Sequence, residues 1–280
     1  MDLKILLDTP PWDWPRDTRE RLLEILRHNR ANKSDRMVAT ELAGDLTVMN
    51  DDLALALIAI VGSPDEPPKM RAQAAISLGP VLELADTEEF EDPDDVPITE
   101  STFRHIQDSF QRLYLDNHVP EEVRKRILEA SVRAPASWHQ DAIRAAYSSG
   151  DQAWIVTAVF SMRFVRGFDD QILESLKNAD PEIHYEAVMA AGNWELDAAW
   201  SHMVELVEDA ATPKPLLLAA IEAAGSIRRG EARETLQDLA DSDDEDIAEA
   251  AGEAIAMAEA LQDEDDEEDE DEEDQADWIN

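Results

Sequence analysis

Cysteine is absent from the 280-residue sequence, glycine is scarce, and long apolar runs are missing. Without cysteine, the chain has no disulfide, thiolate metal ligand or cysteine nucleophile. The longest apolar run, residues 53–61, falls far short of the roughly 20 residues that a membrane-spanning helix needs. Asp8 and Pro10 interrupt the N-terminus before a secretory signal can develop. With only 9 glycines and few alternating β-branched runs, the sequence predicts a helical protein. Since it shows neither a membrane span nor a secretory signal, we expect a cytoplasmic location.

What is present is a helical phrase of 12 residues that recurs seven times. It combines Ala, Val, Leu and Ile at helical spacing, often follows a proline and often ends in glycine, as in PKMRAQAAISLG and PEIHYEAVMAAG. The phrases begin at Lys33, Pro68, Glu121, Asp151, Pro181, Lys214 and Glu245. Their starts lie 30 to 35 residues apart, except for one interval of 53 residues. Since an amphipathic segment precedes each phrase, we predict an all-α, right-handed solenoid of about seven helical pairs.

Three regions follow from this pattern. We predict an irregular N-terminal segment at residues 1–15, because the prolines of PPWDWP remove backbone donors. The repeat solenoid covers residues 16–262, with an acidic insertion at 86–98 that we expect to be a long exposed loop. Residues 263–280 form a tail that we predict to be disordered, since Asp263 to Asp274 are all acidic. The tail either binds a basic partner, folds back over the chain's own arginine clusters, or only confers solubility.

The charge of the chain is strongly negative throughout. The formal net charge is −41, of which residues 263–280 carry −13 and residues 1–262 carry −28. Because the body is acidic without the tail, attraction to a phosphate backbone is disfavoured. We therefore expect a protein partner, with a basic surface as the natural complement, and neither a nucleic acid nor a membrane.

The phrases resemble those of the HEAT-repeat family, in particular its bacterial PBS-lyase-like variety, over roughly residues 16–261. The phrases that begin at Pro68, Glu121 and Pro181 match best. The resemblance implies that the second helix of each pair lines a concave face, and that an arginine at the fourth phrase position pairs with an acidic residue in an intra-repeat turn. Arg36, Arg71 and Arg124 occupy this position and are therefore expected to act in inter-repeat structure. In the later phrases Trp154, His184, Leu217 and Ala248 replace the arginine.

The sequence contains no recognisable catalytic constellation. HEAT-like di-iron hydroxylases depend on repeated His-Glu dipeptides, and this chain has none. Its six histidines are dispersed, and it lacks both a glycine-rich phosphate loop and a G-x-S-x-G elbow. HEAT-like DNA glycosylases use a basic groove, and bilin lyases share the repeat, but no residue here specifies either activity. We predict no metal site, no cofactor and no enzymatic activity.

Large aromatic side chains on the expected second helices supply candidate contact residues. We assign partner binding to Trp154, His184 and Tyr185, together with Arg166. The alternative is that such aromatic residues only fill gaps between repeats. The functional prediction is a noncatalytic interaction scaffold or adaptor. An assembly factor or lyase-like subunit that acts on a cofactor-bearing client is the alternative.

Overall fold

The computed structural model describes residues 3–28, 32–90, 92 and 95–260, and the regular elements among them are all helices. The all-α solenoid of helical pairs is thus confirmed. The chain divides into two compact units, Met1–Ser149 (unit 1) and Gly150–Asn280 (unit 2). The acidic tail predicted at residues 263–280 lies outside the described residues.

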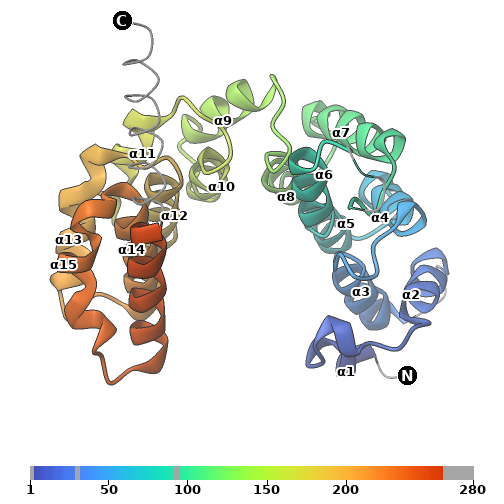
Figure 1. Cartoon of the computed structure of the whole chain (residues 1–280). Helices are drawn as coiled ribbons and strands as arrows, with labels where there is room; N and C mark the ends of the chain where they lie inside the picture. Colours follow the sequence, from blue (N-terminus) through green and yellow to red (C-terminus); the bar gives the residue numbers. More distant parts are fainter. Residues whose placement is uncertain (1–2, 29–31, 91, 93–94, 261–280) are drawn as a thin grey trace, which may run out of the picture. The chain divides into compact units, whose positions relative to one another are not determined.

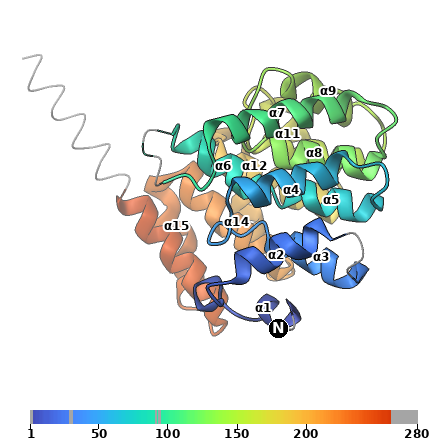
Figure 2. The ribbon, with the colours of Figure 1, turned by 90° about the vertical axis from the view of Figure 1, so that its right-hand side faces the viewer.

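Unit 1 stacks its helical pairs in sequence order (Figures 1 and 2). Its elements are α1 (Leu3–Leu7), the 3-10 turn η1 (Pro11–Asp13), α2 (Thr18–Arg27), α3 (Lys33–Leu42), α4 (Asp51–Gly62), α5 (Pro68–Ile76), α6 (Gly79–Thr87), α7 (Glu100–Leu115), α8 (Glu121–Ser131) and α9 (His139–Tyr147). The pairs are α2 with α3, α4 with α5, and α7 with α8. Second helices also pack on one another, α3 on α5 and α5 on α8, so that each pair buries the apolar stripe of its neighbour.

Unit 2 repeats the arrangement. Its elements are α10 (Gln152–Met162), α11 (Asp169–Ser175), α12 (Pro181–Asn193), the 3-10 turn η2 (Asp197–Ala199), α13 (Trp200–Glu208), α14 (Lys214–Ile227), α15 (Arg229–Ala240) and a last helix at residues 245–260. Helix α11 pairs with α12 and α13 with α14, while the second helices α10, α12 and α14 pack in succession. In Figure 1, α13 and α15 form one layer of this unit and α14 and the last helix belong to the other.

Local sequence signals set where these helices begin. The Asn50 side chain accepts a hydrogen bond from the amide of Leu53, and that of Asp151 accepts one from the amide of Trp154. Asp180 accepts from two amides of α12, directly before Pro181, whose missing amide needs no partner. Caps of this kind satisfy amides that the helix cannot pair internally.

The glycine that closes the phrase lets neighbouring second helices approach closely. A Cβ added at Gly44 would lie 2.7 Å from the carbonyl oxygen of Ser77 on the next repeat. At Gly192 it would lie 2.9 Å from the Cα of Ala223. These distances are shorter than a carbon side chain tolerates, so the small residues fix the spacing between second helices.

Two segments differ from their predicted form. Within the N-terminal segment that we expected to be irregular, residues 3–7 form α1, because Leu3 and Leu6 are buried on one face of a helical turn. The insertion is not an exposed loop throughout. An extra helix, α6, leads into it. In the insertion itself, Val96 and Ile98 are only 4% exposed. Two apolar anchors therefore tie the acidic segment to the core of unit 1.

Candidate functional site

A groove of about 730 Å³ lies over the second helices of unit 2, bounded by residues of α12, α14 and the last helix. Its floor is apolar and includes Leu218, Ala250, Ala254 and Met257. Met257 is 62% exposed, so a large apolar side chain is accessible at the groove. The groove thus offers apolar area that the described part of unit 2 leaves uncovered.

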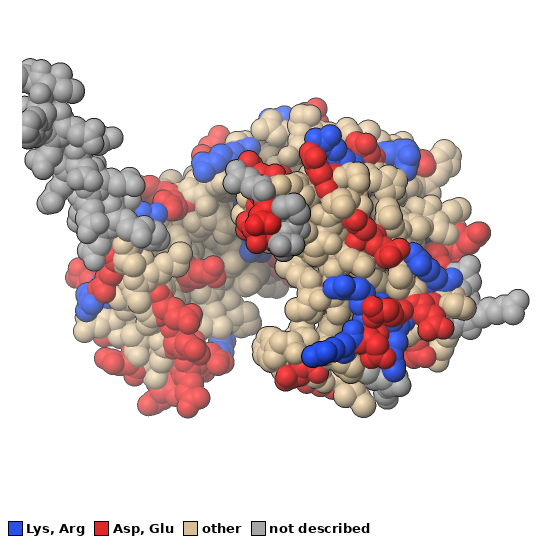
Figure 3. All heavy atoms as spheres, turned by 45° about the vertical axis from the view of Figure 1, so that its right-hand side comes forward, with Lys and Arg blue, Asp and Glu red and all other residues tan. Residues whose placement is uncertain are grey.

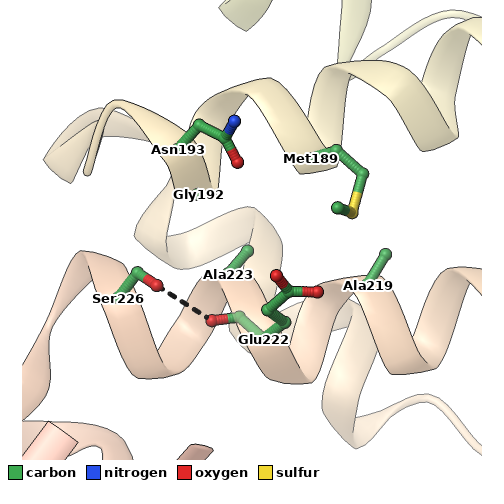
Figure 4. Close-up of a pocket in the computed structure, with 7 residues that line it drawn as sticks. All are labelled: Met189, Gly192, Asn193, Ala219, Glu222, Ala223 and Ser226. Carbon is green, nitrogen blue, oxygen red and sulfur yellow. Dashed lines mark hydrogen bonds between the residues drawn. The ribbon is translucent and has the colours of Figure 1, made fainter. Parts of the chain in front are cut away.

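The lining residues follow the register of the 12-residue phrase. Tyr185, Leu218 and Glu249 hold its fifth position in three successive second helices, and Met189, Glu222 and Glu253 hold its ninth. All of them line this groove except Met189, which lines a smaller niche between α12 and α14. Figure 4 shows Met189 and Glu222 extending from the two helices toward the same space, beside the contact of Gly192 with Ala223. Because residues four apart share one helix face, the repeat places these side chains in rows.

Three carboxylates of the groove have no basic partner among the described residues: Glu222, Glu249 and Glu253. Each is exposed, and the last two are one turn apart on the last helix. Residues 150–260 hold 24 acidic residues against 7 Lys and Arg. Figure 3 accordingly shows mostly acidic side chains on the visible surface of the C-terminal helices. The groove is therefore a negative surface around an apolar floor.

The basic residues near the groove are already engaged by other acids. Arg229 contacts the Glu195 carboxylate at 2.9 Å. The Lys214 ammonium lies 2.6 Å from a carboxylate oxygen of Asp244 and 2.6 Å from one of Asp246. These two carboxylates raise the pKa of Lys214, and the ammonium lowers the pKa of Asp244. Both cations are therefore paired with acids other than Glu222, Glu249 and Glu253.

The structure disperses the residues that we assigned to partner binding. Tyr185 lines the groove. Trp154 is half-buried on α10, and the Arg166 guanidinium lies 4.4 Å from the ring centre of Trp194, a cation–π contact. His184, beside Tyr185 in sequence, faces α13 instead. None of the three acidic residues of the groove was among the predicted contact residues.

His184 on α12 and His202 on α13 form a close pair. Their Nε2 atoms are 2.7 Å apart, and the ring centres are 5.0 Å apart. One ring donates the hydrogen bond and the other accepts it. Burial is the main cause that lowers the pKa of each imidazole. The neighbouring His202 also lowers the pKa of His184, whereas for His202 the Glu205 carboxylate raises the pKa and Lys177 lowers it. The sequence had indicated six dispersed histidines, but the fold brings these two together.

The arginines of the fourth phrase position lie in unit 1. Arg36 makes a two-pronged contact with Glu66, with distances of 2.9 and 2.6 Å, and both side chains are nearly buried. Arg71 donates from Nε to the carbonyl oxygen of Val61 at 2.8 Å, and burial lowers its pKa. Arg124 contacts the side-chain oxygen of Asn117 at 3.3 Å. Glu66 follows α4 in the turn before α5, so the Arg36 contact joins one repeat to the next.

A buried serine–histidine contact in unit 1 does not have the arrangement of a nucleophile and its base. His139 is 1% exposed and accepts a hydrogen bond at Nδ1 from the amide of Ala136. Its Nε2 must then carry the proton and donate to the Ser131 hydroxyl, which in turn donates to the carbonyl oxygen of Leu128. A general base would accept from the serine, so this chain of donors is structural.

No group of three or more His, Asp and Glu side chains is arranged to hold a metal ion in the part of the chain that the structure describes. Within the same residues, no helix has the length and apolarity to cross a membrane.

Comparisons with known proteins show similarity of fold only. No family model matches the sequence, and no curated protein does. Similar solved structures include YibA of Escherichia coli (TM-score 0.45, 15% identity, 88% of this chain and 84% of that one). Human deoxyhypusine hydroxylase is also similar (TM-score 0.41, 16% identity, 92% and 96%). An engineered protein gives a TM-score of 0.35 at 16% identity, over 88% and 98% of the two chains.

The hydroxylase contradicts our functional prediction. We derived a noncatalytic scaffold or adaptor, and the assembly factor as its alternative, from the repeat architecture. That prediction is wrong, because a protein with a similar fold is an enzyme. Architecture alone therefore does not imply a noncatalytic role. The absence of enzymatic activity stays a prediction.

Proposed function

We propose that the protein recognises a basic, amphipathic helical segment of another protein through the groove of unit 2. The observation that carries this proposal is an apolar floor surrounded by the carboxylates of Glu222, Glu249 and Glu253, which lack basic partners among the described residues. Helix-in-groove recognition needs both features, since the apolar face of the helix supplies affinity and the flanking charges set orientation.

The apolar contribution to binding comes from side chains on two neighbouring helices. Leu218 of α14 faces the groove with Ala250, Ala254 and Met257 of the last helix. Alanine at two of these positions leaves space above the helix, so that a leucine or isoleucine of the ligand can fill it. Covering apolar area of this kind stabilises a complex by about 25 cal/mol per Å² before the costs of association.

The charged contribution favours lysine and arginine in the ligand. Glu249 and Glu253 are four residues apart, so they match basic residues at the same spacing on an antiparallel or parallel helix. Their mutual repulsion is relieved when a cation lies between them. An acidic polymer such as a nucleic acid meets the opposite situation, since it would add negative charge to a surface already rich in it.

Peptide binding to the full chain tests the proposal. The probe is a synthetic helix of about 16 residues, with leucines at positions i, i+3, i+4 and i+7 and lysines elsewhere; its counterpart carries glutamates in place of the lysines. We expect binding of the lysine peptide alone, weakened by added salt. The triple variant E222Q/E249Q/E253Q should weaken binding about tenfold, from roughly 0.5 kcal/mol per exposed charge contact.

The matched control is E20Q/E24Q/E41Q, which removes three exposed helical carboxylates from unit 1. Both variants lose the same net charge and keep residues 261–280, so the acidic tail contributes equally. Binding that weakens to the same extent in the two variants would show attraction to overall charge and would rule out the groove. Failure of the wild-type chain to bind the lysine peptide would rule it out as well.

Two broader assignments belong with this proposal. We propose that the helical pairs are HEAT repeats. Arg36, the arginine at the fourth phrase position, and its contact with Glu66 support this assignment. We also propose a cytoplasmic location, in line with the expectation from the sequence. Cell fractionation with an antibody to the chain tests the second assignment.

A further inference from the structure

A second hollow of unit 2 lies between α13 and α15, which belong to one layer of the unit in Figure 1. We call it the α13–α15 cleft, and its volume is about 730 Å³. Leu217 of α14 lines the cleft, whereas the next residue, Leu218, lines the acidic groove. Successive residues of a helix point about 100° apart, so α14 borders two separate surfaces.

The packing of the helices leaves apolar surface accessible in this cleft. Helix α13 packs mainly on α14 and has less contact with α15. Val204 of α13 and Leu239 of α15 line the space between them, and both are only partly buried. The walls of the cleft therefore offer apolar area to a ligand.

Carboxylates line both walls of the α13–α15 cleft. Glu208 lies at the end of α13, and Glu234 and Asp238 lie one turn apart on α15. All three are exposed, and no Lys or Arg of the described ranges pairs with any of them. A cationic ligand is therefore the electrostatic complement of both walls.

One end of the cleft already holds a cation of the chain itself. The Cζ atom of Arg228 lies 5.5 Å from the ring centre of Trp200, and its Nη1 lies 3.5 Å from a carboxylate oxygen of Glu231. Trp200 and Glu231 both line the cleft. The groups at this end thus accommodate a guanidinium between an aromatic ring and a carboxylate, which indicates the kind of side chain that the rest of the cleft fits.

We propose that the α13–α15 cleft binds an extended, arginine-rich segment of another protein. In an extended chain successive side chains point to opposite sides, so consecutive arginines reach both walls at once. Their aliphatic stems lie against Val204 and Leu239, and their guanidinium groups meet the carboxylates. This site is separate from the groove proposed for an amphipathic helix and does not depend on it.

The length of the cleft sets the length of the probe. Helix α15 has 12 residues, which corresponds to about 18 Å. A hexapeptide in extended conformation is about 20 Å long, so hexa-arginine matches the wall. Hexaglutamate is its counterpart and should not bind.

Binding of hexa-arginine to the full chain tests the proposal. The variant E208Q/E234Q/D238N should bind the peptide about tenfold more weakly than the wild type, because it removes three exposed charge contacts. The amphipathic lysine peptide should bind this variant as it binds the wild type, since the carboxylates of the acidic groove are intact. Failure of the wild-type chain to bind hexa-arginine would overturn the proposal.

The control variant is again E20Q/E24Q/E41Q, which loses the same charge from unit 1. It should keep most of its affinity for hexa-arginine. Equal weakening in the two variants would overturn the proposal, because attraction would then follow the overall charge of the molecule.

An NMR measurement on the wild-type chain keeps the test independent of variant folding. The indole N–H signal of Trp200 should shift when hexa-arginine is added, because the peptide enters beside its ring. The signal of Trp12 in unit 1, which is 79% exposed, should stay in place. A bound peptide that leaves the Trp200 signal unchanged, or shifts both signals equally, would overturn the proposal.

Discussion

At the residue scale, the Arg36–Glu66 pair and the carboxylates of the groove differ in how their charges are matched. In unit 1, Arg36 and Glu66 are nearly buried and form an ion pair with each other. In unit 2, Glu222, Glu249 and Glu253 stand exposed around apolar surface without a basic partner among the described residues. A buried charge must be matched to be tolerated, while an exposed unmatched one costs little and remains available for a ligand.

A pH dependence of stability follows from His139. Burial lowers its pKa from 6.5 to about 4. Because the unfolded chain takes up the proton first, the stabilisation is complete above about pH 6.5 and is lost as the pH falls toward 4, by about 3 kcal/mol. His184 and His202 act in the same direction. Urea unfolding between pH 7 and 4 measures this change.

The assignment to His139 is checked by NMR titration of its imidazole. We expect a midpoint near pH 4, well below the ordinary value for an imidazole. A midpoint near 6.5 would mean that the ring is solvated, and it would remove the donor chain through Ser131 as a stabilising feature.

The groove residues were within reach of the sequence, but the histidine pair was not. Aligning the phrases places Glu222 and Glu253 at the ninth position of adjacent second helices. The contact prediction rested on the fourth position instead. By contrast, His184 and His202 lie on helices of different layers, and their contact depends on how α13 is turned after the η2 segment. Phrase periodicity carries no information about that rotation.

At the element scale, the glycine at the end of the phrase sets how closely second helices pack. Gly192 faces the backbone of Ala223 on α14, as Figure 4 shows. Gly252 in the last helix has no atom within 4 Å of an added Cβ. The same residue type therefore has a packing role at one position and none at the other.

Replacing each of these glycines by alanine should have opposite effects. Gly192→Ala should lower the free energy of unfolding by about 1–3 kcal/mol, because the two helices must separate. Gly252→Ala should raise it by about 0.5–1 kcal/mol through helix propensity. Chemical denaturation of both variants measures the difference. Equal effects would show that the close approach does not limit packing.

The helices themselves were largely predictable, and the insertion was not. Capping residues such as Asp180 and the period of the phrase located the pairs. The insertion reads as acidic and proline-rich, so its composition indicated solvent exposure throughout. The single apolar residues Val96 and Ile98 were decisive, because two buried side chains outweigh a hydrophilic average. Only the fold shows that unit 1 has room for them.

At the scale of the whole molecule, the two units have separate cores. A continuous apolar cluster of unit 1 extends from Leu3 to Ala134. Leu57→Ala and Met203→Ala each remove a fully buried side chain, from unit 1 and unit 2 respectively. Each should destabilise its own unit by about 2–5 kcal/mol. Calorimetry should resolve two transitions, of which each variant lowers one. A single transition lowered by both variants would contradict independent units.

The acidity of the molecule was evident from composition, but whether its acidic residues form a binding groove depends on the fold. Net charge predicts which polymers are repelled, but it does not distinguish a solvated surface from a binding groove. That distinction comes from Met257, which the last helix leaves exposed between carboxylates. The functional prediction failed at this scale, because it moved from repeat architecture to function without a site.

Methionine methyl NMR tests the proposed groove most directly. Of the 8 methionines in the chain, Met257 alone is among the exposed large apolar residues described, whereas Met49 and Met203 are buried. With the lysine peptide added to saturation, the Met257 methyl signal should shift while that of Met49 in unit 1 stays in place. A bound peptide that leaves Met257 unchanged would contradict recognition through the groove.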